Sequence, residues 1–184
     1  ALLNNTTGLQ NVAIGLQALV NNTTGSYQVA IGFQSLSQNT TGTWNTSTGN
    51  WSMAANTTGS YNTAYGMWSL QSNTTGAYNV ALGVQALSLN TTGNYNTAVG
   101  YQAGYNNTTG NQTVFGYQAG YSGSTNSRFT AVGYLAGYSS TSSFNAYFGS
   151  YAGQYVTGQQ NTAIGDLSMQ GVSGSSTGTG NTSV

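Results

Sequence analysis

The side chains best placed to carry chemistry in this sequence are asparagines in N-linked glycosylation sequons. Seven of them open an Asn-Thr-Thr-Gly run and recur every 17 residues, at Asn5, Asn22, Asn39, Asn56, Asn73, Asn90 and Asn107. In a secreted protein of a glycosylating host, the amide nitrogens of these asparagines could carry glycans. The run could equally supply only turn and ladder chemistry, because Asn and Gly adopt positive φ cheaply and asparagines in register hydrogen-bond to one another.

Three tryptophans in neighbouring repeats form a second group with binding chemistry. Trp44, Trp51 and Trp68 could stack on sugar rings while nearby Asn and Gln amides bind sugar hydroxyls. The same rings could instead fill the core or join an aromatic column, whose members at a spacing of 17 are Tyr27, Trp44, Tyr61, Tyr78 and Tyr95. The sequence leaves both interpretations open.

A threonine column offers a third kind of surface. It recurs at Thr6, Thr23, Thr40, Thr57, Thr74, Thr91 and Thr108, and a flat, regular Thr array on a β-solenoid can order water as an ice-binding face. Each of these threonines is followed by a second one, however, and neighbours in an extended segment point to opposite sides. Ice binding is therefore only a minor alternative.

The charge content excludes most other chemistry. Only Arg128 and Asp166 are charged, and the chain has no His, Cys, Lys or Glu. Metal sites built on thiolate or imidazole, carboxylate-pair catalysis and Lys- or His-based catalysis all lack their essential groups. A single arginine cannot neutralise a phosphate backbone. We therefore expect no enzyme, no catalytic residue, no metal, no cofactor and no nucleic-acid partner.

The elements that must position these side chains come from a repeat that covers the chain. Glycines that follow an Ala-Ile/Val/Leu step recur at spacings of 17 and then mostly 16, at Gly15, Gly32, Gly49, Gly66, Gly83, Gly100, Gly116, Gly133, Gly149 and Gly165. Alternation before this glycine predicts a short strand, and a second apolar segment after it predicts another strand beyond a bend. Units this small bury a core only when stacked. We therefore predict an all-β fold, a parallel β-solenoid or β-roll of about ten coils in one continuous stack.

The repeat divides into two parts. Residues 1–110 hold regular 17-residue Asn-Thr-Thr-Gly coils, whereas residues 111–184 hold variant coils of the same solenoid. In the later coils Ala-Leu becomes Ala-Gly-Tyr, as at Ala119, Gly120 and Tyr121, which predicts a repacked turn. Because the chain starts and stops inside a repeat, we expect a window on a longer array.

The element N-x-A-I/V-G-x-x-A, found for example at residues 11–18 and 96–103, resembles the head repeats of trimeric autotransporter adhesins. Those YadA-like heads are left-handed parallel β-rolls with three chains packed side by side, and similar repeats occur in phage tail fibres and bacterial surface fibres. The resemblance implies a homotrimer and an extracellular, cell-surface or virion-surface location.

Together these features predict a structural role. We expect a non-catalytic section of an extracellular fibre, appendage or adhesin shaft or head, a rigid neutral rod that self-associates and could carry glycans on its turns. A carbohydrate- or host-surface-binding module of an adhesin or tail fibre is the alternative. No stretch approaches 18 apolar residues, so no membrane-spanning segment is expected.

Overall fold

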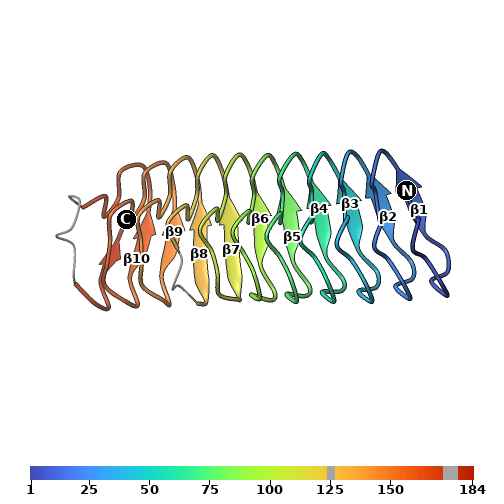
Figure 1. The fold of residues 1–184 in the computed structure, drawn as a ribbon. Helices are drawn as coiled ribbons and strands as arrows, with labels where there is room; N and C mark the ends of the chain where they lie inside the picture. Colours follow the sequence, from blue (N-terminus) through green and yellow to red (C-terminus); the bar gives the residue numbers. More distant parts are fainter. Residues whose placement is uncertain (124–126, 172–177) are drawn as a thin grey trace.

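The computed structural model describes residues 1–123, 127–171 and 178–184, and within them it is a parallel β-solenoid of about ten coils (Figure 1). The strands form one sheet in chain order, each paired in parallel with the next. The all-β prediction is confirmed, and the described residues contain no helix. The strands are β1 (Val12–Ile14), β2 (Val29–Ile31), β3 (Thr46–Thr48), β4 (Thr63–Tyr65), β5 (Val80–Leu82), β6 (Thr97–Val99), β7 (Gln112–Phe115), β8 (Phe129–Val132), β9 (Ala146–Phe148), β10 (Thr162–Ile164) and β11 (Thr182–Ser183).

The strand register follows the sequence repeat. Ala64 in β4 lies opposite Ala81 in β5, and Ala98 in β6 lies opposite Val114 in β7. The change from a period of 17 to 16 is absorbed in the turn after Asn107, outside the strands. There Nδ2 of Asn96 donates to the carbonyl of Thr109 at 2.9 Å. In earlier coils the acceptor is instead the carbonyl of the turn glycine, as for Asn79 and Gly93. The sheet therefore runs unbroken through the regular and the variant coils.

The expectation of two strands in each coil was wrong, because the segment after the bend is curled. Ser35 and Leu36 are both fully buried, and adjacent side chains of an extended strand cannot both point inward. Gln34 and Leu36 achieve this arrangement with positive φ values of 55° and 52°. The segment still bonds to the next coil, since the Leu36 N–H donates to the Ser52 carbonyl at 3.1 Å.

The turn chemistry also differs from the expectation. Neither Asn56 nor Gly59 of an Asn-Thr-Thr-Gly run has positive φ. A glycine is required at position 59 because there is no room for a side chain: a Cβ there would overlap the carbonyl oxygen of Gly76 in the next coil. Positive φ lies at the bend glycine, such as Gly66 at 127°, and at the aromatic position, such as Tyr61 at 59°.

The apolar side of the core is filled to a similar extent in the two kinds of coil, although the residues that fill it differ. In the first coils a buried leucine such as Leu87 lies beside a small strand residue, Ala98. Gly104 replaces the leucine in the following coil, and Val114 replaces the alanine. Further along, Phe129 and Tyr147 fill the same space, and a Cβ on the intervening Gly137 would collide with Phe129. The Leu-to-Gly change in the sequence is therefore compensated across the core.

The buried Tyr147 makes stability sensitive to alkaline pH. Burial raises the pKa of Tyr147 to about 12 and the neighbouring Ser140 partly opposes this, whereas the phenol of an unfolded chain has a pKa of about 10. The unfolded state therefore loses this proton first, so the contribution is complete below pH 10 and is lost as the pH rises through about 12. We expect a loss of about 2 to 3 kcal/mol over this interval.

Urea unfolding followed between pH 9 and pH 12 checks this expectation. Tyr147→Phe should unfold with a shallower pH dependence than the wild type, while Tyr65→Phe, at an exposed position of the sheet, should keep the wild-type dependence. Equal slopes for all three proteins would contradict the assignment.

Candidate functional site

The sequon asparagines lie inside the solenoid and form a hydrogen-bonded ladder. Asn22, Asn39, Asn56, Asn73, Asn90 and Asn107 are fully buried, and Asn5 at the first coil is half-buried. The Nδ2 of Asn73 donates to Oδ1 of Asn56 at 2.7 Å and to the carbonyl of Gly76 at 3.0 Å. The same pair of bonds occurs at Asn56 and Asn90. The Asn-Thr-Thr-Gly run therefore supplies an interior ladder that links the successive coils from Asn5 to Asn90.

A second amide ladder runs in parallel at the residue before β3, β4, β5 and β6, continues to Gln112 and is interrupted by Phe129, which occupies the same column at β8. The N–H of Asn62 donates to Oδ1 of Asn45 at 2.9 Å, and Nδ2 of Asn62 donates to the carbonyl of Gly76 at 2.8 Å. The carbonyl of Gly76 thus receives one amide from each ladder, since Asn73 also donates to it. Part of the core is therefore a network of neutral amides, which satisfies most of the polar groups that burial would otherwise penalise. Within the described residues the exceptions in the sequon column are Oδ1 of Asn90 and Nδ2 of Asn107, which are buried without a partner.

This geometry sets a condition on N-linked glycosylation. A glycan is attached through Nδ2, and in the folded coils this atom is enclosed and already makes two hydrogen bonds at Asn39, Asn56, Asn73 and Asn90. A modified Asn56, for example, would lose a bond to Asn39 and could not fit inside the coil. Glycosylation at these positions stays a prediction, and it requires attachment before folding and the loss of the local ladder.

The three tryptophans lie in two separate columns at opposite ends of β3 and β4. Trp44 is stacked between Tyr27 and Tyr61, with ring centroids 4.0 Å and 6.5 Å away. Trp51 and Trp68 are stacked on each other at 5.9 Å in the column that also holds Gln34. Stacking along the axis uses the ring faces that would receive a sugar. Sugar stacking stays a prediction, and in this arrangement a sugar meets ring edges instead of open faces.

The threonine column is also engaged in bonds between coils. The hydroxyls of Thr6, Thr23, Thr40, Thr57 and Thr74 each donate to the carbonyl of the equivalent threonine in the next coil, at 2.9 to 3.1 Å. Thr57, for example, donates to Thr74 at 3.0 Å. These hydroxyls therefore contribute to axial cohesion and present no free donor to solvent.

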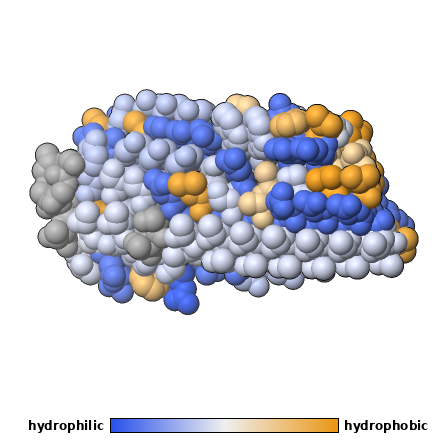
Figure 2. Space-filling view, viewed as in Figure 1, coloured by the Kyte–Doolittle hydropathy of each residue, from blue (hydrophilic) through white to orange (hydrophobic). Residues whose placement is uncertain are grey.

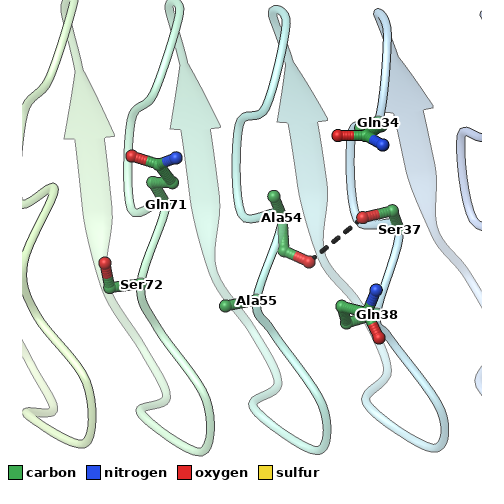
Figure 3. A pocket seen from close by; sticks show the side chains of 7 residues that line it. All are labelled: Gln34, Ser37, Gln38, Ala54, Ala55, Gln71 and Ser72. Carbon is green, nitrogen blue, oxygen red and sulfur yellow. Dashed lines mark hydrogen bonds between the residues drawn. The ribbon is translucent and has the colours of Figure 1, made fainter.

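The surface carries a hollow of about 370 Å³ that crosses three coils. It is lined by Gln34, Ser37, Gln38, Ala54, Ala55, Gln71 and Ser72 (Figure 3). On this face of the rod, side chains of similar hydropathy gather in rows along the long axis (Figure 2). The hollow interrupts such rows because Ala54 and Ala55 stand where the neighbouring coils carry longer side chains. This site was missed from the sequence, although the two adjacent alanines were its visible signal.

The two charged side chains do not form a site together. Arg128 occupies the position of the aromatic column and lies over the Phe144 ring, 5.5 Å from its centroid, while Asp166 is exposed near the end of the rod. Across the described ranges there is no cluster of three or more potential metal-ligating His, Cys, Asp or Glu residues. The same ranges hold no helix of the length and apolar character needed to cross a bilayer.

We also compared the chain with known proteins. No protein-family model matches the chain, and no curated protein or solved structure is significantly similar to it. The architecture and its surfaces are therefore the basis for assigning a function.

Proposed function

We propose that this chain is a non-catalytic structural section of an extracellular fibre, appendage or adhesin, and that its working property is axial rigidity. The observation that carries the proposal is the continuity of bonding along the axis. Backbone bonds join successive coils through the strand, the curled segment and the turn, as at Thr63, Leu70 and Thr74. The two amide ladders repeat the connection inside the core. Each regular coil is thereby fixed to the next at the strand, the curled segment, the turn and the core.

The outward face of the sheet supports self-association as part of this role. The middle residue of each three-residue strand points inward, so the residue on each side of it points out. The residue that precedes the bend glycine is apolar in nearly every coil, as at Ile14, Tyr65 and Phe148, which are 58%, 62% and 42% exposed. An apolar stripe therefore follows the rod, and such stripes mark interaction sites on soluble proteins.

A second copy of the chain is the partner that best fits this stripe. Ten coils about 4.8 Å apart and strands mostly of three residues give roughly 500 Å² per copy, or about 1,000 Å² in total, which is at the lower end for a specific protein interface. The face carries no charge that would oppose an identical face. Its side chains also repeat with the same spacing on both copies, so the ridges of one copy can lie between those of the other.

Sedimentation velocity and negative-stain electron microscopy test the proposal together. The wild type should form elongated oligomers, and the double variant Tyr65→Lys/Leu82→Lys should give single rods of the same length, because charges on the stripe oppose burial. The matched control is Thr58→Lys/Thr75→Lys, which adds the same charges to exposed turn positions of the same two coils and should remain oligomeric. Compact particles would contradict the rod, and a monomeric wild type would contradict the interface.

A further inference from the structure

We propose that the hollow at Ala54 and Ala55 is a binding site for a neutral saccharide. The proposal does not depend on the fibre role, because it concerns side chains on another face of the coil. Figure 3 shows Ala54 and Ala55 between Ser37 and Gln38 of one coil and Gln71 and Ser72 of another. The cavity volume of about 370 Å³ lies within the range of small-molecule sites.

The hollow forms where an exterior amide ladder stops. Nδ2 of Asn4 donates to Oδ1 of Asn21 at 3.2 Å, and Nδ2 of Asn21 donates to Oε1 of Gln38 at 3.2 Å. The next position of this column is Ala55, which cannot accept the amide of Gln38. The Nε2 group of Gln38 therefore stands at the edge of the hollow as a donor with no acceptor among the described residues.

The opposite edge also presents side-chain polar groups with no partner in the described part of the chain. The side chains of Gln71 and Ser72 make no hydrogen bond to another described residue. Only their backbones are bonded to the neighbouring coils: the Gln71 carbonyl accepts the Ala55 N–H at 3.0 Å, and the Ser72 N–H donates to the Ser88 carbonyl at 3.0 Å. Ser37 differs, because its hydroxyl donates to the Ala54 carbonyl at 3.2 Å. Two amides and a hydroxyl thus flank two alanine methyl groups (Figure 3).

The chemistry of these groups selects the class of ligand. No charged residue lines the hollow, so an ionic ligand would find no counter-charge. A purely apolar ligand would leave the amides unpaired on losing their water. A neutral saccharide offers hydroxyls that donate to and accept from amides, and C–H groups that pack on the alanine floor. The span from Gln38 to Gln71, two coils or about 10 Å, fits one or two sugar rings.

A tryptophan beside the hollow provides a spectroscopic reporter. Gln34 lines the site, and its Oε1 accepts a hydrogen bond from Nε1 of Trp51. Its Nε2 is held by Oε1 of Gln17 at 2.5 Å. A ligand that contacts Gln34 therefore changes the surroundings of the Trp51 indole without displacing the ring from its stack on Trp68.

The experiment is a titration of the whole chain with maltohexaose, cellohexaose and chitohexaose, and with hexagalacturonate as the anionic comparison. At least one neutral oligosaccharide should bind with a dissociation constant on the order of 1 mM or tighter. Binding should shift the side-chain amide NMR signals of Gln38 and Gln71 and change the tryptophan fluorescence. Ala55→Gln should weaken binding at least about tenfold, because the new side chain fills the hollow and continues the Asn21–Gln38 ladder.

Leu89→Gln is the matched control, because residue 89 holds the same position two coils further along the rod. It should bind the oligosaccharide as the wild type does. Failure of all three neutral oligosaccharides to bind, equal or tighter binding of hexagalacturonate, or unchanged binding by Ala55→Gln would each overturn the proposal. Sedimentation of the same samples reports the rod and its assembly separately, so failure of the saccharide site and failure of the fibre role are distinguishable.

Discussion

Asn73→Asp is expected to destabilise the solenoid by about 3 to 5 kcal/mol at pH 7, although it changes one NH₂ group to oxygen. Nδ2 of Asn73 donates to two oxygen acceptors, Oδ1 of Asn56 and the carbonyl of Gly76. An ionised carboxylate in its place turns an oxygen toward those two acceptors, in a fully buried position with no cation nearby. The substitution therefore replaces two hydrogen bonds with repulsion and buries an unpaired charge.

The pH dependence of this variant distinguishes the charge from a loss of packing. Burial raises the pKa of the new carboxyl above its unfolded value of about 3.9, so the folded state holds its proton longer than the unfolded state. Stability is then lost as the pH rises through this interval and partly regained on acidification to pH 4. Urea unfolding, with hydrogen exchange resolving the separate coils, measures both effects.

Asn94→Asp is the control for this prediction. Asn94 is exposed, and its Oδ1 accepts the N–H of Ala77 at 2.7 Å, which a carboxylate oxygen does equally well. The control should unfold within about 0.5 kcal/mol of the wild type. A loss at Asn94 equal to that at Asn73 would show that net charge, rather than the interior ladder, governs stability.

Gly66→Ala should have an effect of similar size, about 2 to 6 kcal/mol, for a steric reason. Gly66 has a φ of 127°, and a Cβ there would lie 2.7 Å from both the carbonyl carbon and the oxygen of Gly83. The backbone strain and the overlap with a neighbouring backbone each cost about 1 to 3 kcal/mol. Because Gly83 belongs to the next coil, the coils must separate locally, and coil-resolved hydrogen exchange should show faster exchange on both sides of Gly66.

Gly165→Ala separates the two contributions. Gly165 occupies the same column with a φ of 116°, but the nearest heavy atom to a Cβ there is Cβ of Ser168 at 4.0 Å. We expect only the strain cost of about 1 to 3 kcal/mol at this position. Equal losses at Gly66 and Gly165 would show that the close approach of coils contributes nothing.

These predictions explain why the chain has only two charged residues. Columns such as Asn56 and Asn73 repeat a side chain in every coil and enclose it, so an ionised group in them would lack both water and a counter-charge. The two exceptions lie on the outside: Arg128 is exposed over Phe144, and Asp166 is exposed near the last bend. Neutrality is therefore a condition of stacking, and the sequence already indicated it.

The sequence by itself determined the all-β class, the coil length and the in-register columns, because a period of 17 with local alternation has few solutions other than stacked strands. It also identified the Asn and aromatic columns. It could not determine which columns point inward. Leu36 and Ser35 are adjacent and both buried, which depends on positive φ values that no propensity predicts for leucine or glutamine.

Only the tertiary structure decided the roles of the candidate site residues. The Asn-Thr-Thr-Gly asparagine resembled an exposed turn residue because turn chemistry is local, whereas its partners are the previous asparagine and a glycine carbonyl held in place by the stack. The hollow beside Ala55 likewise exists only because Gln38 and Gln71, far apart in sequence, are brought to two coils around it. Spacing in the sequence sets which side chains share a column, and the path of the backbone within each coil sets whether that column is core or surface.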